Sequence, residues 1–457
     1  MQIDSPPRPA SARRLAPLPA AADVHGILGR HLLADGYPFV LDMAASRPGY
    51  LRDALSGRDL VDLFTFYASS PLGMNHEALA GDSPDAVAFR ERLLDAALNK
   101  VANSDVYTPH MARFVDTFSR VGIPGHLPHA FFVSGGALAV ENALKVAFDW
   151  KSRLNERRGI AAPGGQVLHL REAFHGRSGY TMSLTNTDPN KTARFPQFDW
   201  PRIDTPKLHA GPDTWPVEVR EAFAVRQAEA FFLSRKNDIA AIIVEPIQAE
   251  GGDNHLRPQF LLELRRLADE NDALLVFDEV QTGVGLTGTF WAYQGLGVVP
   301  DVLAFGKKTQ VCGILAGPRV DEVEDNVFHK SSRINSTWGG SLVDMVRFDR
   351  VLEVIEAEDL VGNAWRTGAG LLARLETLAD RFENVTDPRG RGLMCAFDLP
   401  DTAARNAVLN RAYELGAVVL GCGPRTVRFR PSLAATPAQI AEGLDIVEQS
   451  LRDTLEA

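Results

Sequence analysis

The chain has 457 residues, of which 45% are hydrophobic and 23% are charged, a composition typical of a globular protein with one big core or a large and a small domain. Its formal net charge of −10 at pH 7 excludes a protein that reads nucleic acid through a basic face, and no apolar run approaches the roughly 20 residues that span a bilayer. Cys312, Cys395 and Cys422 are far apart and lack metal-ligand spacing, so we expect reduced thiols in a cytoplasmic protein that binds no metal.

The opening of the chain is rich in Pro, Ala and Arg. We expect an extended arm there rather than a transit peptide, because Asp4 and the repeated prolines are unlike such peptides. Beyond about residue 30, short apolar runs alternate with amphipathic stretches, which is the pattern of an α/β domain. We predict three parts: residues 1–75 as an N-terminal arm and a segment that contributes to a small domain, 76–340 as a large cofactor-binding domain, and 341–457 as the C-terminal small domain.

A glycine pair followed by a helical pattern stands at residues 134–145, in SGGALAVENALK. Gly135 and Gly136 let the backbone turn tightly, and Leu144 and Phe148 have the i, i+4 spacing of a helix face. Free N–H groups at the start of such a helix suit a phosphate dianion. Two glycines before a helix are a weak motif by themselves, so phosphate binding depends on what the fold brings near them.

The segment AFHGRSGY, residues 173–180, offers an aromatic ring and a cation. Phe174 is a candidate for stacking on a planar ligand, and Arg177 is a candidate for binding a carboxylate through two parallel hydrogen bonds. Taken alone, a core phenylalanine and a surface arginine are the more ordinary interpretation.

Two continuous apolar runs, 241–244 and 273–277, have the pattern of strands buried on both faces. Apolar residues between them, at 260–268, fall at helical spacing. Strand, helix and strand in this order predict a right-handed crossover between parallel strands. EPIQAEGG follows the first run directly and puts Glu245 and Glu250 at the carboxyl edge of the sheet, where open α/β sheets bind ligands.

Asp278 and Lys307 each stand where an apolar run ends, in FDEVQTG and PDVLAFGKK. Alone, each residue is more often a solvated surface group. An acid and an amine at neighbouring strand ends, however, match what pyridoxal phosphate requires. The amine bonds to the cofactor, and the acid keeps the pyridine nitrogen protonated so that the ring withdraws electrons. The pair therefore predicts a pyridoxal-phosphate site.

The chain changes character after residue 341 and becomes typical of an α+β domain. It shows two helical patterns and then two stretches of short strands with turns, at 342–356, 363–383, 390–399 and 417–431. Within the last stretch, TVRFRPSL places Arg428 and Arg430 in alternation along a strand.

In this order, EPIQAEGG, DEVQTG, PDVLAFGK, STWGG and VRFRP resemble the class III aminotransferases, the ω-aminotransferase branch of the fold-type I pyridoxal-phosphate enzymes. The resemblance runs from about residue 35 to the end of the chain. It implies an α/β fold with a mainly parallel sheet in the large domain and a smaller α+β domain. Two features depart from the usual pattern: Ala137 stands where most members have Thr, and Val284 and Leu286 replace a frequent aromatic residue and arginine.

The resemblance implies pyridoxal 5′-phosphate as the cofactor and a homodimer whose two subunits share each active site. It implies that Lys307, and not Lys308, forms the Schiff base and carries the proton, and that Asp278 pairs with the ring nitrogen. The other implied cofactor contacts are Gln281 at the phenolic oxygen, Phe174 and Val280 on the two ring faces, Gly136 and Ala137 at the phosphate, and Thr337 at the phosphate from the neighbouring subunit.

Longer matches, such as FTFYASSPLGMN and LNKVANSDVYTPHMARFV, resemble the members of this family that act on the ε-amine of L-lysine. They imply transfer of that amine to 2-oxoglutarate, which gives 2-aminoadipate 6-semialdehyde and glutamate. The implied substrate contacts are Arg177 for the lysine carboxylate, Arg428 for the acceptor, Glu250 as a switch that pairs with Arg428 while lysine is bound, and Glu245 and Asn335 as further lining residues.

Three alternatives remain open at the level of sequence. Another ω-aminotransferase, acting on ornithine, 4-aminobutyrate or diaminobutyrate, would keep the cofactor residues and differ near Ser69 and Asn335. A racemase or aminomutase of the same fold needs no dicarboxylate acceptor, so the joint presence of Glu250 and Arg428 counts against it. A catalytically inactive member would be expected to lack Lys307 or Asp278, and both are present.

Overall fold

Apolar runs that are buried on both faces form the central sheet of the molecule. The computed structural model describes residues 16–209, 211 and 214–455, so most of the predicted N-terminal arm lies outside the described residues. The central sheet has seven strands in the order β4-β12-β11-β10-β7-β5-β6. Their bounds are β4 His129–Val133, β12 Cys312–Ala316, β11 Val302–Phe305, β10 Leu274–Asp278, β7 Ile239–Val244, β5 Gln166–Leu170 and β6 Arg202–Ile203. All neighbours pair in parallel except β12, which is antiparallel to both β11 and β4, so the predicted mainly parallel α/β sheet is confirmed.

The predicted strand–helix–strand unit is confirmed. β7 leads through α10, Pro258–Glu270, into β10, and the two strands pair in parallel with Ala241 opposite Leu274. α10 begins with a proline at its first turn, where the missing N–H costs no helical hydrogen bond. Its buried residues fall on one face and pack against the sheet: Phe260, Leu261, Leu264, Leu267 and Ala268.

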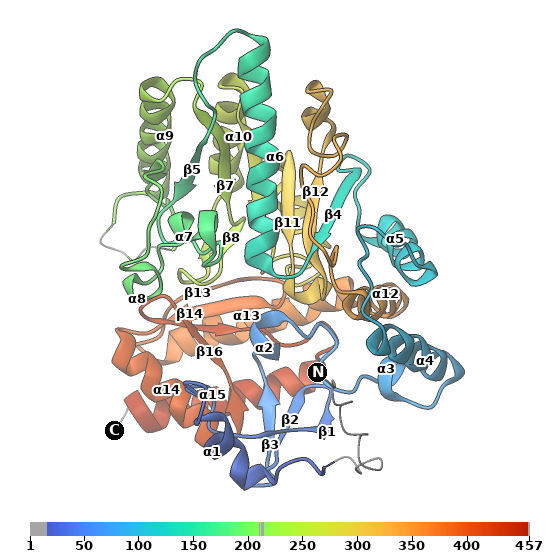
Figure 1. The fold of residues 1–457 in the computed structure, drawn as a ribbon. Coiled ribbons are helices and arrows are strands. Elements are labelled where there is room, and N and C mark those ends of the chain that lie inside the picture. Colours follow the sequence, from blue (N-terminus) through green and yellow to red (C-terminus); the bar gives the residue numbers. More distant parts are fainter. Residues whose placement is uncertain (1–15, 210, 212–213, 456–457) are drawn as a thin grey trace, which may run out of the picture.

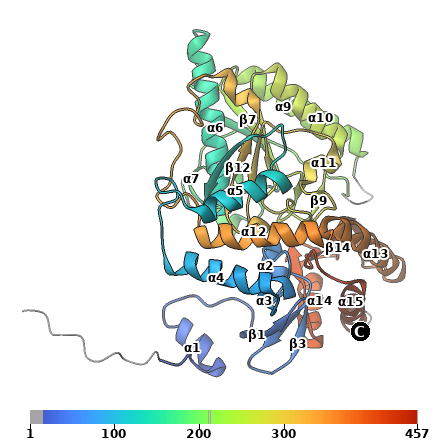
Figure 2. The same ribbon diagram turned by 90° about the vertical axis from the view of Figure 1, so that its right-hand side faces the viewer.

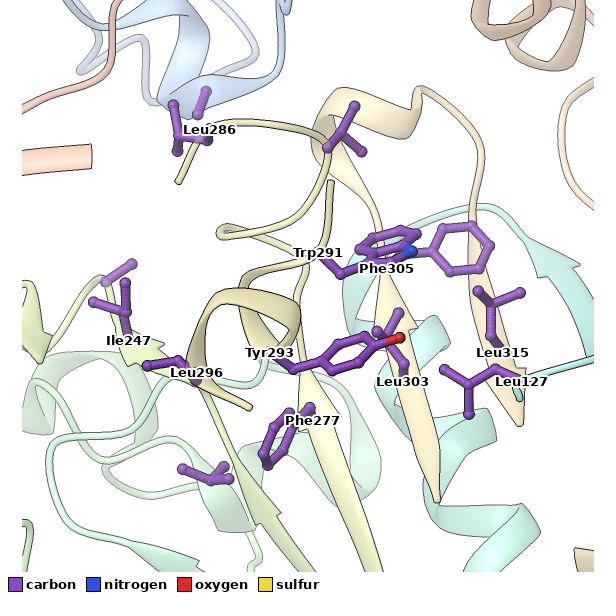
Figure 3. Packing of buried hydrophobic residues seen from close by; sticks show 14 of the residues in the cluster. Leu127, Ile247, Phe277, Leu286, Trp291, Tyr293, Leu296, Leu303, Phe305 and Leu315 are labelled. Carbon is purple, nitrogen blue, oxygen red and sulfur yellow. The ribbon is translucent and has the colours of Figure 1, made fainter. Parts of the chain in front are cut away.

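Successive residues of the central strands pack into two different hydrophobic cores, one on each face of the sheet. Leu275 and Phe277 of β10 join one core, together with Trp291 and Tyr293 (Figure 3). Leu274 and Val276 face the opposite core, which is built on the helix α6, Gly136–Arg157. Because side chains alternate along a strand, Asp278 continues the face that α6 covers. This alternation aims the strand-end carboxylate toward the side of the sheet where the glycine-pair helix lies.

Two smaller sheets lie below the central sheet (Figure 1). One has the order β1-β2-β3-β15, so a strand from near the C-terminus pairs in parallel with an N-terminal strand. The other has the order β13-β14-β17-β16 and is antiparallel. Their bounds are β1 Leu41–Arg47, β2 Tyr50–Asp53, β3 Asp59–Asp62, β15 Ala417–Val418, β13 Thr386–Arg391, β14 Met394–Asp398, β17 Thr426–Phe429 and β16 Leu420–Cys422.

Helices cover both parts of the molecule, and α12 passes between the central sheet and α4 in the turned view (Figure 2). The helical patterns near 342–356 and 363–383 correspond to α12 and α13. The bounds are α1 Val24–Leu28, α3 Glu77–Ala80, α4 Pro84–Leu98, α5 Pro109–Val121, α7 Gly179–Leu184, α8 Pro189–Thr192, α9 Val217–Ser234, α11 Ala292–Leu296, α12 Leu342–Ala357, α13 Leu360–Arg381, α14 Thr402–Leu415 and α15 Pro437–Leu455. Within the described residues, none of the helices has the length and apolar character needed to cross a membrane.

Candidate active site

The carboxyl ends of β10 and β11 meet at a cavity of about 310 Å³. The two strands pair in parallel, with Asp278 opposite Ala304, so the residue that ends β10 and the lysine after β11 come to the same edge. The predicted site residues that line the cavity are Gly136, Ala137, Phe174, Arg177, Glu245, Glu250, Asp278, Val280, Gln281 and Lys307. Five chain segments that are separate in the sequence therefore supply one site.

The structure distinguishes the two adjacent lysines. Lys307 lines the cavity, and with the Gln281 amide oriented to satisfy both its ends, the amide oxygen accepts from Lys307 Nζ at 3.2 Å. Burial lowers the pKa of Lys307, and the nearby Arg428 lowers it further. Lys308 points elsewhere: its Nζ donates to the backbone oxygen of Gln281 at 2.6 Å, and burial holds its pKa well below the usual value. Lys307 is thus the amine that a ligand in the cavity can reach.

Asp278 is held in place by a buried histidine. His175 Nδ1 lies 2.8 Å from Asp278 Oδ2, and the backbone N–H of Val280 donates to Oδ1 at 3.1 Å. Both side chains are buried, at 0% and 5% exposure. Within the described residues His175 Nε2 has no hydrogen-bond partner. The carboxylate keeps a fixed orientation at the cavity wall, which an acid must have if it is to pair with a ring nitrogen.

The start of α6 fits a phosphate group. The N-cap residue Gly135 makes no side-chain capping bond, so the first N–H groups of this 22-residue helix are left for a ligand. A Cβ added at Gly136 would lie 3.1 Å from Val280 Cγ1, which leaves little room for any side chain there. Glycine lets the backbone border the cavity here without crowding Val280, and the residues present fit pyridoxal phosphate.

Glu245 is buried and binds backbone rather than charge. Its Oε1 accepts from the N–H of Phe174 at 2.9 Å and its Oε2 accepts from the N–H of Ala249 at 3.1 Å. Burial, aided by the repulsion of Asp278, raises the pKa of Glu245 to about 7. The carboxyl group fixes the position of the two segments that carry Phe174 and Glu250, and its predicted contact with substrate stays a prediction.

Glu250 binds two cations at once. Its Oε2 accepts from Arg428 Nη2 at 2.9 Å, and its Oε1 accepts from Lys191 Nζ at 2.6 Å. Burial raises the pKa of Glu250, but the two cations outweigh burial and the net pKa is lowered. Arg428 does not itself line the cavity but is fully buried behind Glu250, and within the described residues its Nε and Nη1 have no hydrogen-bond partner.

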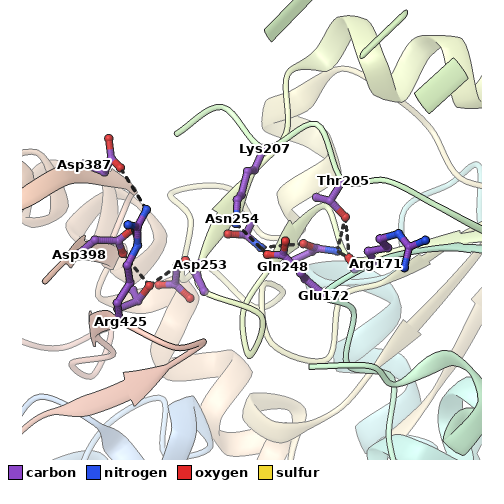
Figure 4. Close-up of polar contacts among 12 residues, drawn as sticks. Arg171, Glu172, Thr205, Lys207, Gln248, Asp253, Asn254, Asp387, Asp398 and Arg425 are labelled. Atoms are coloured by element: carbon purple, nitrogen blue, oxygen red, sulfur yellow. Dashed lines mark hydrogen bonds and ion pairs between the residues drawn. The ribbon is translucent and has the colours of Figure 1, made fainter. Parts of the chain in front are cut away.

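The loop that carries Glu250 is fixed on both sides by polar contacts (Figure 4). Asn254 donates to Gln248 and to Glu172, at 2.9 Å each. Asp253 binds Arg430 through both carboxylate oxygens, at 2.9 and 2.5 Å. Glycine is needed at position 251, because a Cβ there would lie 2.0 Å from the backbone oxygen of Glu172.

Three predicted site residues, Arg428, Asn335 and Thr337, do not line the cavity of the single chain. Arg177 does line the cavity, and its side chain is exposed. Asn335 and Thr337 do not line the cavity of the single chain and are exposed on the segment before α12. The predicted contact of Thr337 comes from a neighbouring subunit, and the predicted contacts of both residues stay predictions.

Two functional candidates were missed by sequence reasoning. His175 stands inside AFHGRSGY next to Phe174, so its place in that motif was a usable signal for a partner of Asp278. Lys191 stands on the four-residue helix α8, and no pattern in the sequence pointed to its contact with Glu250.

The sequence matches the family model described as Aminotransferase class-III over residues 34–451. The chain is 58% identical over 440 residues to the L-lysine-epsilon aminotransferase of Mycobacterium bovis, covering 96% of this chain and 97% of that protein. It is 53% identical over 444 residues to the enzyme of the same name from Amycolatopsis lactamdurans, covering 96% of this chain and 98% of that protein. The solved structure of the lysine aminotransferase from M. tuberculosis in the internal aldimine form matches with a TM-score of 0.93 and 58% identity, over 95% of this chain and 100% of that one.

Proposed function

The chain belongs to the class III aminotransferases, and from that premise we propose that it moves the ε-amino group of L-lysine to 2-oxoglutarate. The products are 2-aminoadipate 6-semialdehyde, which cyclises, and L-glutamate. The strongest support is that one cavity holds an accessible lysine, an oriented aspartate and a glutamate paired with a buried arginine. Ornithine, 4-aminobutyrate and diaminobutyrate are less favoured as donors, because relatives at 51–58% identity over nearly the whole chain are named for L-lysine.

The cofactor is pyridoxal 5′-phosphate, as throughout this family and its fold type. When bound, it supplies an aldehyde that joins to an amine and a protonated ring that withdraws electrons from the reacting carbon. Asp278 is suited to hold the proton on the ring nitrogen, and His175 holds Asp278 in position. The free N–H groups at the start of α6 are suited to the phosphate, and Phe174 and Val280 to the two faces of the ring.

Lys307 acts as the general base and acid of the reaction. Burial and the positive charge of Arg428 lower the pKa of Lys307, so the neutral amine that accepts a proton forms more readily than on an exposed lysine. Its Nζ would take the proton from Cε of lysine and deliver it to C4′ of the cofactor. Lys308 cannot replace it, because its Nζ is bound to the backbone oxygen of Gln281.

Two substrates must use the same cavity in turn. Lysine enters with its ε-amine toward Lys307 and its carboxylate toward the exposed Arg177, and Glu245 lines the same cavity. Asn335 lies outside the cavity of the single chain, and its contact with substrate stays a prediction. 2-Oxoglutarate carries a second carboxylate close to the reacting carbon, and that group needs Arg428. Glu250 pairs with Arg428 while lysine is bound and releases it when 2-oxoglutarate binds. The specificity for each substrate therefore depends on whether the carboxylate of Glu250 or that of the acceptor is paired with Arg428.

The two half-reactions test this proposal spectroscopically. Purified yellow protein mixed with L-lysine alone should lose its cofactor absorbance, and 2-oxoglutarate added afterwards should restore it. If L-ornithine bleaches the protein and L-lysine does not, the donor assignment is wrong. If 2-oxoglutarate fails to restore the absorbance while another oxo acid succeeds, the acceptor assignment is wrong.

We propose further that the enzyme is a cytoplasmic homodimer whose subunits share each active site. Thr337 is exposed in the single chain and would reach the phosphate of the partner. Cys312, Cys395 and Cys422 are free thiols, which accords with a reducing compartment. Subunit complementation tests the sharing: mixing inactive Lys307→Ala with a Thr337→Asp variant should give heterodimers with one intact site and recover activity. No recovery from mixed dimers would show that each site belongs to one subunit.

A further inference from the structure

The carboxylate of Glu250 is divided between two cations that come from different parts of the fold. Arg428 belongs to β17 in the lower antiparallel sheet, and Lys191 belongs to α8, which lies at the lower end of the upper part of the molecule (Figure 1). α8 begins at its N-cap Asp188, whose side chain accepts from the N–H of Asn190 at 2.9 Å. Glu250 therefore has a second partner that does not depend on Arg428.

The two cations differ in what else they can bind. Arg428 is 1% exposed, and in the described part of the chain its Nε and Nη1 are unpaired, so it has donors in reserve for a ligand carboxylate. Lys191 is 25% exposed, and its Nζ lies 5.5 Å from the centre of the Phe174 ring, so it keeps contact with water and with an aromatic face. A substrate gains most by taking the place of Glu250 on Arg428, because a buried guanidinium has few alternatives.

We propose that Lys191 is a positioning residue that keeps Glu250 ionically paired after the dicarboxylate acceptor has taken Arg428. This inference rests on the proposed function and adds to it a residue that determines how much free energy is needed to separate Glu250 from Arg428. With lysine bound, Glu250 is shared between both cations. With 2-oxoglutarate bound, Glu250 stays on Lys191 alone. The carboxylate of Glu250 thus loses Arg428 but keeps Lys191, so it is never an unpaired charge in the partly buried cavity.

The expected effect of removing Lys191 is selective for the acceptor. Without Lys191, Glu250 has only Arg428, so the acceptor must displace a carboxylate that has no other cation to bind. We expect Lys191→Met to weaken binding of the dicarboxylate about tenfold, which corresponds to about 1.4 kcal/mol. The lysine half-reaction leaves the Glu250–Arg428 pair intact, so its rate constant and apparent affinity should change by less than about twofold.

The test uses the holoenzyme and a dicarboxylate that cannot react. Glutarate has the two carboxylates of the acceptor and no keto group, so calorimetric titration gives its affinity without any turnover. Lys191→Met is compared with Arg158→Met, a control that removes a half-exposed pair between Arg158 and Asp272 at 2.5 Å, neither of which lines the cavity. Lys191→Arg should recover most of the affinity. The lysine half-reaction of each variant is followed by the cofactor absorbance.

The same measurements in a Glu250→Ala background decide how Lys191 acts. If Lys191 works through Glu250, then Lys191→Met should not change glutarate affinity once Glu250 is absent. An equal loss of glutarate affinity in both backgrounds would mean that Lys191 attracts the dicarboxylate directly. No loss in the native background would mean that the contact between Lys191 and Glu250 does not affect acceptor binding. Either result overturns the proposal, as does an equal fall in the rates of both half-reactions. Failure of native protein to react with L-lysine would instead refute the proposed donor, while the glutarate titrations would still test Lys191.

Discussion

Asp253 and Arg430 form an ion pair in which both side chains are completely buried, and removing one charge should destabilise the protein strongly. Asp253→Asn is the sharpest change, because asparagine keeps the size of the side chain and tolerates the positive φ of 48° at this position. It leaves the guanidinium of Arg430 without its counter-charge at 0% exposure. Breaking a buried pair on one side costs about 3–5 kcal/mol, so a loss of that size is expected.

The matching double variant separates the charge from the packing. Asp253→Asn combined with Arg430→Met removes both charges and leaves an apolar side chain of similar reach, so most of the 3–5 kcal/mol should be regained. Urea denaturation at 25 °C, followed by circular dichroism, gives the midpoint and slope for the four members of the cycle. If the double variant is as unstable as the sum of the two single variants, the pair is not the source of the stability and the reasoning fails.

Three further changes have direct readouts. Borohydride reduction should fix the cofactor to the Lys308→Met variant but not to Lys307→Ala, because only Lys307 lines the cavity; labelling of Lys307→Ala would reverse the assignment. His175→Ala should weaken cofactor affinity about tenfold in a fluorescence titration, since Asp278 loses a buried hydrogen bond at 2.8 Å; unchanged affinity would leave His175 without a role. Glu245, whose pKa is raised to about 7, retains in the folded state a proton that the unfolded chain releases near pH 4.5, so stability should fall as pH rises between these values, by at most about 1.4 kcal/mol per pH unit. Glu245→Gln should flatten this part of the urea-midpoint profile, and an unchanged slope would show that another group is responsible.

The parts of the fold that follow local rules were predictable from sequence. The apolar runs at 241–244 and 273–277 are long enough and bounded clearly enough to identify buried strands, and the helical spacing between them fixes the parallel pairing. Asp278 and Lys307 each follow an apolar run, and the structure pairs these two strands, β10 and β11, in parallel.

The parts that tertiary contacts impose were not predictable. Residues 65–68 form a left-handed turn, with φ of 53° at Phe66 and 60° at Tyr67, although threonine and aromatic residues favour strands. The turn persists because Thr65 is held at both ends: its N–H donates to Asp62 Oδ1 at 2.7 Å and its Oγ1 donates to the backbone oxygen of Arg430 at 2.7 Å. No local pattern encodes a bond to a residue so distant in the chain.

The same reason explains the gaps in the predicted site. The bond between His175 and Asp278 joins the end of one strand to the loop after another, and the sequence gives the direction of neither side chain. The contact between Lys191 and Glu250 depends on where a four-residue helix comes to rest. The predicted role of Thr337 depends on a second subunit. In each case the missing information is the relative placement of distant segments.

Isotope transfer tests the central claim most directly. Holoenzyme is incubated with 2-oxoglutarate and with L-lysine labelled with ¹⁵N at either the ε- or the α-nitrogen, and the glutamate formed is analysed by mass spectrometry. Removal of the ε-amine by the site around Lys307 and Asp278 predicts labelled glutamate from ε-labelled lysine and unlabelled glutamate from α-labelled lysine. Labelled glutamate from α-labelled lysine, or no glutamate from either, would contradict the account.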